Sequence, residues 1–201
     1  GSYSGAVAVL VVDADNTQAD HVDEVSKKPI DLNGNLMAAG TVAAGNTVQT
    51  LNINPITTVA GLEVGLQVTS DGMNLQAASV LDTSKSSIAN TAVAKALLGS
   101  SATESSMLSG LVVPTVNTDG SNNSNANIYG QMLAVLAGMD ALNSGVASTT
   151  YSLLVAGIND SGGLSDSAKS ALVQGTSAAG VPVSVLPFSI SSGGSLTNAQ
   201  I

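Results

Sequence analysis

The apolar residues of the N-terminal part come in short runs separated by turn residues. Residues 3–13 read Y-S-G-A-V-A-V-L-V-V-D, a partly β-branched run of the length that predicts a strand. Residues 47–54, where valine, leucine and isoleucine stand among polar residues, predict a second strand, and residues 36–42 a third and weaker one. We therefore expect residues 1–58 to form part of a β-sandwich.

After Pro55 the apolar residues recur at intervals of three and four, which is the spacing of helices with one buried face. Residues 59–177 are therefore expected to form a helical subdomain. Four helices are predicted: one over 84–98 that ends at Gly99, one from about 126 to 136 or beyond, one that begins near 148, and one over 165–175 with Ser165 as its N-cap.

The C-terminal part, residues 178–201, is expected to hold a strand and a flexible tail. Residues 180–190 read G-V-P-V-S-V-L-P-F-S-I, and their apolar side chains alternate as in a strand. Pro182 and Pro187 each lack a donor, so they confine this strand to the edge of a sheet. The predicted fold class is α+β, with the helical subdomain inserted before the C-terminal strand.

The composition narrows the classes of function. Only 9% of the 201 residues are charged, and fourteen acids against five lysines and no arginine give a formal net charge of −9. A nucleic-acid partner is not expected, because phosphate binding needs clustered lysine and arginine. Aromatic residues make up 2% of the chain, which argues against a ring-lined groove for a carbohydrate or a peptide. No apolar run is long enough for a membrane span, and the many small residues imply close approach of backbones.

One cluster of residues has the chemistry of a metal site. Asp13, Asp15, Asn16 and Asp20 lie in D-A-D-N-T-Q-A-D, which gathers several hard oxygen ligands in one turn, as calcium sites of extracellular modules do. The segment lacks the glycine and the final glutamate of an EF-hand loop. Asp13, Asp15 and Asp20 are therefore candidate calcium ligands, and an exposed acidic turn without an ion is the alternative.

A catalytic role has little support. His21 is the only histidine, no G-x-S-x-G turn accompanies it, and cysteine is absent. We expect His21 to be a surface histidine, the protein not to be an enzyme, and no cofactor other than calcium to be bound.

Four segments carry a resemblance to a known family. They are Y-S-G-A-V-A-V-L-V-V-D at 3–13, V-D-E at 22–24, D-L-N-G-N-L-M-A at 31–38 and N-I-N-P-I-T-T-V-A at 52–60. In this order they resemble a module of large proteobacterial surface adhesins, although the family has a T-P-L-T-like element where this chain has N-P-I-T. The Ala-rich stretches N-T-A-V-A at 90–94 and Y-G-Q-M-L-A at 129–134 are similar to the downstream part of that family.

The resemblance implies an extracellular location at the bacterial cell surface, an immunoglobulin-like β-unit, and a role in adhesion or surface assembly without a reaction. Together, the residue pattern and the resemblance predict a partial immunoglobulin-like β-sandwich with a helical subdomain. The expected function is that of a structural subunit or module that associates with copies of itself in a surface filament or adhesin. Strand exchange is the expected mechanism, since strands precede the Y-x-G segment in the family, and residues 181–190 are the expected donor. A ligand-binding adhesin domain that recognises a glycan or a host protein is the alternative, and a secreted hydrolase is disfavoured.

Overall fold

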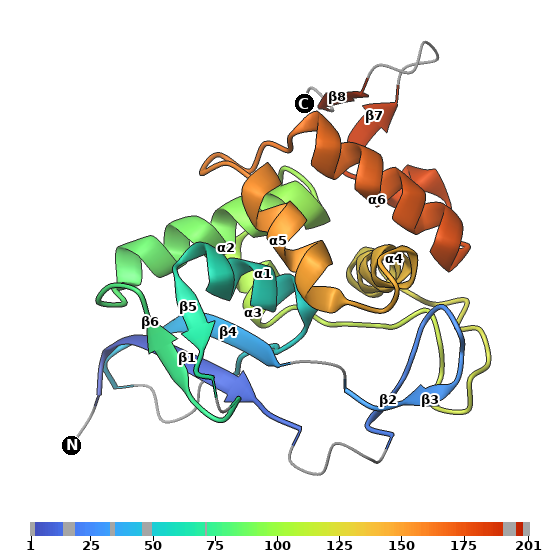
Figure 1. Cartoon of the computed structure of the whole chain (residues 1–201). Helices are drawn as coiled ribbons and strands as arrows, with labels where there is room; N and C mark the ends of the chain where they lie inside the picture. Colours follow the sequence, from blue (N-terminus) through green and yellow to red (C-terminus); the bar gives the residue numbers. More distant parts are fainter. Residues whose placement is uncertain are drawn as a thin grey trace.

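The computed structural model of the chain describes residues 3–13, 19–32, 35–45, 50–70, 72–190 and 196–198. Within these residues the fold is mixed α/β: six α-helices pack around one main core, and the strands occur as small antiparallel pairs (Figure 1). The helices are α1 Pro55–Glu63, α2 Thr83–Leu98, α3 Glu104–Leu108, α4 Ile128–Leu142, α5 Ala147–Gly157 and α6 Asp166–Ala179. The strands are β1 Gly5–Val11, β2 His21–Val22, β3 Pro29–Ile30, β4 Leu36–Val42, β5 Leu66–Val68, β6 Leu75–Ala77, β7 Phe188–Ile190 and β8 Leu196–Asn198.

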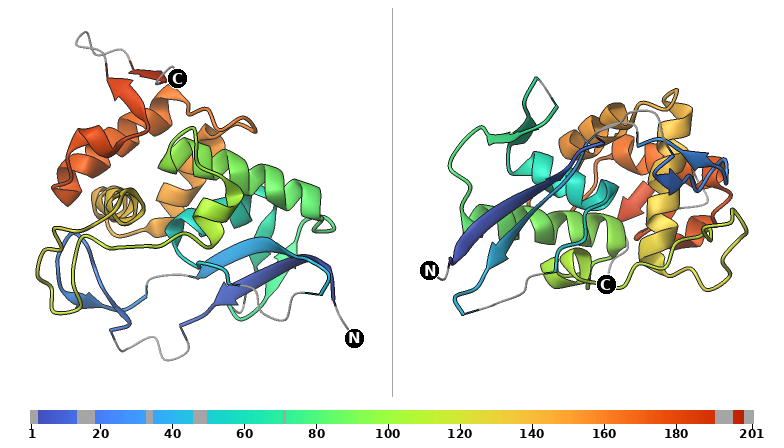
Figure 2. Two further views of the ribbon diagram at one scale, coloured as in Figure 1. Left: turned by 180° about the vertical axis from the view of Figure 1, so that it is seen from behind. Right: turned by 90° about the horizontal axis from the view of Figure 1, so that it is seen from below.

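The longest strands, β1 and β4, pair with each other along their whole length. Their antiparallel register runs from Gly5 opposite Val42 to Val11 opposite Leu36. Seen from below, the two strands lie side by side, and in the view from behind the helices lie above them (Figure 2). The strands predicted over 3–13 and 36–42 are thus confirmed, whereas an immunoglobulin-like arrangement of this part stays a prediction.

The strand predicted over 47–54 is wrong for residues 50–54, and residues 47–49 lie outside the described part. The backbone N–H of Asn52 donates to the carbonyl of Leu108 at 2.6 Å, and its side-chain amide donates to Met107 and Gly110 at 3.0 and 2.9 Å. These bonds attach the segment to α3 and the residues after it. Asn54 then caps a helix, so the polar residues of this run serve loops rather than a strand.

Helix α1 begins in the N-P-I-T segment, which holds a complete set of start signals. The Asn54 side chain accepts from the N–H groups of Ile56 and Thr57, the Thr57 hydroxyl accepts from the N–H of Asn54, and Pro55 occupies the first turn. The sequence reasoning missed this helix. It also missed α3 and the β5–β6 pair.

The four predicted helices are present as α2, α4, α5 and α6; α6 has its predicted N-cap, Ser165, but a different C-terminal end. This helix passes the predicted stop at Gly175 and ends at Gly180, which has a left-handed conformation with φ of 65°. Gly175 is needed inside the helix because a Cβ there would lie 2.5 Å from the carbonyl oxygen of Val135 on α4. A Cβ at Gly138 would lie 2.2 Å from the carbonyl oxygen of Gly175. The close backbone approach expected from the composition is therefore confirmed where α4 and α6 cross.

The single strand predicted over 180–190 is also wrong. Residues Val183–Val185 form a 3₁₀ turn after Pro182, and only Phe188–Ile190 is extended, paired with β8. Val185, Leu186 and Phe188 are buried in the main core. Burial here does not follow the alternation of a strand, since the adjacent Val185 and Leu186 are both buried whereas Val183 is 41% exposed, and Pro182 precedes the turn.

Candidate interaction sites

The two edges of the β1–β4 pair differ in how their backbone groups are satisfied. On the β4 side, the N–H of Met37 donates to the hydroxyl of Thr58 on α1 at 3.0 Å. The carbonyl of Ala39 accepts from the side-chain amide of Asn90 on α2 at 3.0 Å. Thr58 and Asn90 are almost fully buried, so side chains of the helices close the outer edge of β4.

The register then fixes which groups of β1 point away from β4. In an antiparallel pair, opposite residues alternate between those that bond to each other and those whose N–H and C=O groups point outward. Met37 and Ala39 point outward, so their partners Leu10 and Ala8 do as well. The next outward residue is Ala6, whose carbonyl accepts from the hydroxyl of Tyr3 at 2.6 Å.

No described strand pairs with this side of β1. We call the outward backbone groups of Ala8 and Leu10 the open edge. The strand is seven residues long, carries no charge, and exposes 37% of Val9 and 38% of Val11. Uncharged edge strands of this length are templates for an added strand.

The predicted metal ligands are only partly brought together. Asp13, Asp20 and Asp31 offer carboxylate oxygens that lie within 4.8 Å of one another, and we call them the acidic triad. Asp15 and Asn16 lie outside the described residues. Asp31 was not predicted because it lies eleven positions beyond Asp20, and the loop around β2 and β3 is needed to bring it back. The N–H of Leu32 donates to the carboxylate of Asp20 at 3.1 Å, which keeps the two ends of this loop together.

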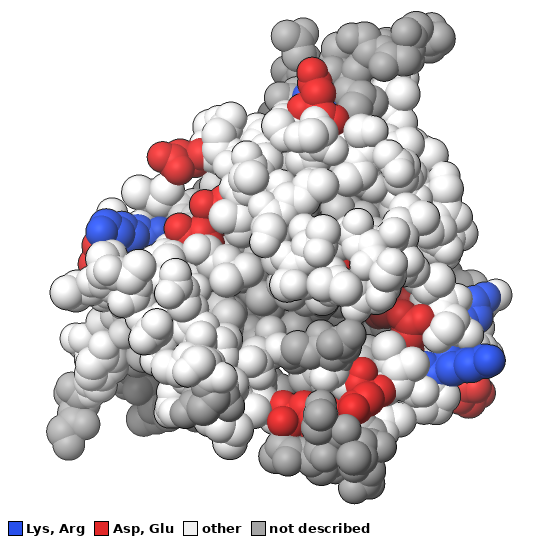
Figure 3. Space-filling view, viewed as in Figure 1, with Lys and Arg blue, Asp and Glu red and all other residues white. Residues whose placement is uncertain are grey.

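A groove of about 880 Å³ lies between the β2–β3 hairpin and helices α4 and α5. We call it the acidic groove. Five carboxylates line it, those of Asp20, Asp23, Glu24, Asp31 and Asp140, together with His21. Acidic side chains gather on the face of the molecule that carries this hairpin (Figure 3). His21 is exposed there, as predicted for a surface residue, and the described lining contains no serine, threonine, cysteine or lysine.

Burial changes the acidity of several groups in the groove. The pKa values of Glu24 and Asp140 are raised, first by desolvation and then by the nearby charge of Asp23, against the lowering effect of hydrogen bonds. Desolvation also raises the pKa of Tyr151, and the charge of Asp140 adds to that rise. The groove therefore concentrates negative charge in a partly desolvated place.

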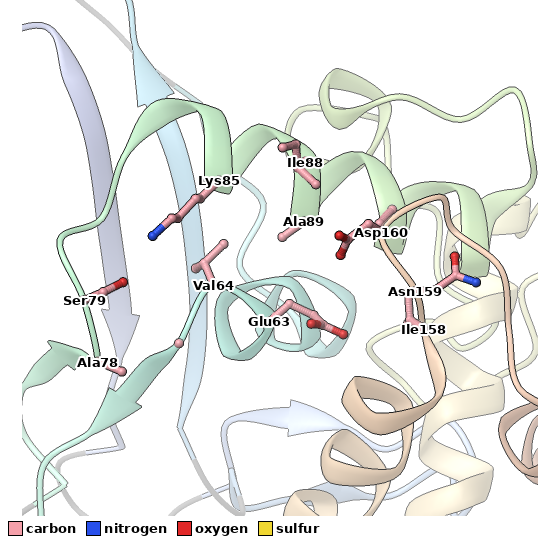
Figure 4. Close-up of a pocket in the computed structure, with 12 residues that line it drawn as sticks. Glu63, Val64, Ala78, Ser79, Lys85, Ile88, Ala89, Ile158, Asn159 and Asp160 are labelled. Atoms are coloured by element: carbon pink, nitrogen blue, oxygen red, sulfur yellow. The ribbon is translucent and has the colours of Figure 1, made fainter.

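A smaller pocket of about 380 Å³ lies where α1 ends beside α2. Figure 4 shows Glu63 on α1 facing Asp160 of the loop after α5, with Lys85 and Ser79 toward the other end of the pocket. Desolvation raises the pKa of Glu63, and the charge of Asp160 raises it further. The Nζ atom of Lys85 lies 4.0 Å from the Oδ2 atom of Asp82, which is the N-cap of the same helix.

Comparison with protein-family models, with curated proteins and with solved structures gave no match. The resemblance to surface adhesins therefore stays a prediction. Within the described ranges, no helix combines the length and the apolar character that crossing a bilayer requires.

Proposed function

We propose that the protein is an extracellular structural module of a bacterial surface filament or adhesin, and that it associates with copies of itself through β1. The observation that carries this proposal is the open edge. The opposite edge of the same pair is closed by buried side chains of two helices, whereas Ala8 and Leu10 have outward backbone groups that no described strand pairs with. An added strand would satisfy these groups.

The partner strand that fits best is the β1 of a second copy. Two β1 strands laid edge to edge would join the two pairs into one four-stranded sheet with two-fold symmetry, the commonest symmetry of self-association. The strand is uncharged, so the contact itself brings no like charges together. Residues 181–190 are a poor donor, because withdrawing them would expose the buried side chains of Val185, Leu186 and Phe188.

The overall charge opposes this association and makes its strength depend on the salt concentration. Two copies that each carry a formal charge of −9 repel one another at low ionic strength. Salt shortens the range of that repulsion from about 30 Å at ~0.01 M to about 8 Å at ~0.15 M. Association through β1 should therefore strengthen as salt is added.

Sedimentation velocity over a range of protein and salt concentrations tests the proposal. We expect a dimer whose fraction grows with both concentrations, because a two-fold contact uses the open edge of both copies. Ala8→Pro should abolish the dimer, since it removes an outward N–H without removing a bond to β4. Val9→Lys should also weaken association, because lysine on an edge strand opposes pairing. Leu111→Lys is the matched control, since Leu111 is 77% exposed in a loop and the change in charge is the same. Equal association of all four proteins, or a monomer under every condition, would contradict the proposal.

A ligand-binding adhesin domain is the second candidate, and the acidic groove is the observation that favours it. A protein ligand with basic side chains is the kind that fits the groove, because five carboxylates line it and Tyr151 is the only aromatic residue in its described lining.

A further inference from the structure

Carboxylates dominate the charged residues that line the acidic groove. Five of its lining residues are carboxylic acids, and no lysine lines the described part. The two ion pairs found in the described residues lie elsewhere, one at the start of α2 and one on α6. Lys27, at the turn of the β2–β3 hairpin, instead donates to the side chain of Asn122 at 2.6 Å. The groove thus focuses a negative potential that cations of a ligand would meet.

Asp140 is the carboxylate for which a cation would matter most. It lies on α4 and lines the groove. Its Oδ1 atom is buried and has no hydrogen-bond partner among the described residues. A desolvated carboxylate with an unused oxygen costs free energy unless a donor or a positive charge faces it. A guanidinium or ammonium group entering the groove would supply both.

The rest of the lining is apolar and suits the stem of a basic side chain. Leu36, Leu133 and Ala137 line the groove together with Ile30 of the hairpin and the ring of Tyr151. Lysine and arginine cover apolar surface with their methylene stems while the charged end reaches a polar partner. Arginine has the further advantage that its guanidinium is weakly hydrated and stacks on aromatic rings.

We propose that the acidic groove binds a basic segment of a partner polypeptide, in which arginine or lysine side chains alternate with apolar ones. The carboxylates lie on two sides of the groove, on the hairpin and on α4. A single cation could contact only some of them, whereas several cationic side chains on one polypeptide could contact both sides. The volume of about 880 Å³ lies within the range of sites that enclose small ligands or a few side chains. This binding does not depend on the pairing of β1.

Isothermal titration calorimetry with a synthetic peptide tests the proposal. The probe is acetyl-Arg-Ala-Leu-Arg-Ala-Leu-Arg-amide, and the same peptide with citrulline in place of arginine is the neutral control. A calcium chelator is present, so that no ion competes for Asp20 and Asp31. We expect the arginine peptide to bind and the citrulline peptide to bind at least about tenfold more weakly, since charged hydrogen bonds are about twice as strong as neutral ones.

Protein variants locate the binding. Asp140→Asn should weaken it about tenfold, and Glu24→Gln should weaken it by a smaller factor, because each removes one charge with little change of shape. Asp160→Asn is the matched control: it removes the same charge from an exposed residue of the smaller pocket and should leave the affinity within about twofold. Circular dichroism of each variant checks that the fold is kept.

Three results would overturn the proposal. They are no binding of the arginine peptide, equal losses in Asp140→Asn and Asp160→Asn, and equal binding of the citrulline peptide. Binding of spermidine without binding of the peptide would also overturn it, because the ligand would then be a small polyamine. Salt separates this site from the pairing of β1: peptide binding should weaken with added salt, whereas self-association should strengthen.

Discussion

Replacing Thr58 by valine should break the contact that closes the outer edge of β4. The two side chains have nearly the same shape, so the substitution leaves no cavity, and the effect comes from the lost hydroxyl. That hydroxyl accepts from the N–H of Met37 at 3.0 Å and donates to the carbonyl of Asn54 at 2.9 Å. The carbonyl of Asn54 keeps its helical bond from the N–H of Thr58, but Met37 is 3% exposed and its N–H loses its acceptor.

A buried donor without an acceptor costs about 1–3 kcal/mol, so we expect the free energy of unfolding to fall by about 2 kcal/mol. For a chain of this length that loss lowers the midpoint of thermal unfolding by about 4–8 °C. Urea unfolding followed by far-ultraviolet circular dichroism measures the first quantity, and a thermal scan the second.

Thr118→Val is the matched control, because Thr118 is exposed in the loop before α4 and should change the free energy of unfolding by less than about 0.5 kcal/mol. A loss in Thr58→Val no larger than in this control would refute the reasoning. The N–H of Met37 would then have another acceptor, and the edge of β4 would not depend on the helices.

Three further results are expected. Gly138→Ala should cost about 2 kcal/mol in urea unfolding, although alanine is the better helix former, because its Cβ would lie 2.2 Å from a carbonyl oxygen of α6; unchanged stability would show that the helices can separate. The pKa values of Glu24, Glu63 and Asp140 are raised in the folded protein, so it takes up these three protons before the unfolded chain does. The free energy of unfolding should therefore rise as the pH falls from 7 toward the ordinary pKa values of these groups. Stability curves against pH test this, and a flat or falling curve over that range argues against it. Millimolar calcium should raise the thermal midpoint through the acidic triad, and Asp31→Asn should remove the rise; the same midpoint with calcium and with chelator would show that the triad holds no ion.

Local patterns in the sequence were enough to predict most helices and the two long strands. Helices α2, α4 and α6 start at Asp82, Asn127 and Ser165, whose side chains each accept from a backbone N–H of the first turn. Helix α1 was missed because its residues 56–59 are all β-branched and follow a run that alternates like a strand. Its threonines are favourable there because they bond to the cap and to β4, and those contacts come from the tertiary structure.

The candidate sites depend on residues that are distant in the sequence, which explains what could not be predicted. The spacing of Asp13 and Asp20 pointed to a metal site, but Asp31 joins them only when β2 and β3 pair. The acidic groove needs Asp140 from a helix more than a hundred residues after the hairpin. The strand predicted over 180–190 was wrong because alternation of apolar residues does not separate a strand from a segment that turns within a core.

Amide hydrogen exchange of β1, measured with and without assembly, tests the account most directly. The N–H groups of Ala8 and Leu10 point to the open edge, whereas those of Val7 and Val9 face β4. In the monomer, at low protein and salt concentration, we expect Ala8 and Leu10 to exchange fast and Val7 and Val9 to exchange slowly. In assemblies formed at high concentration and salt, all four should exchange slowly, because a neighbouring strand then bonds to the open edge. Assemblies in which Ala8 and Leu10 still exchange as fast as in the monomer would contradict the account.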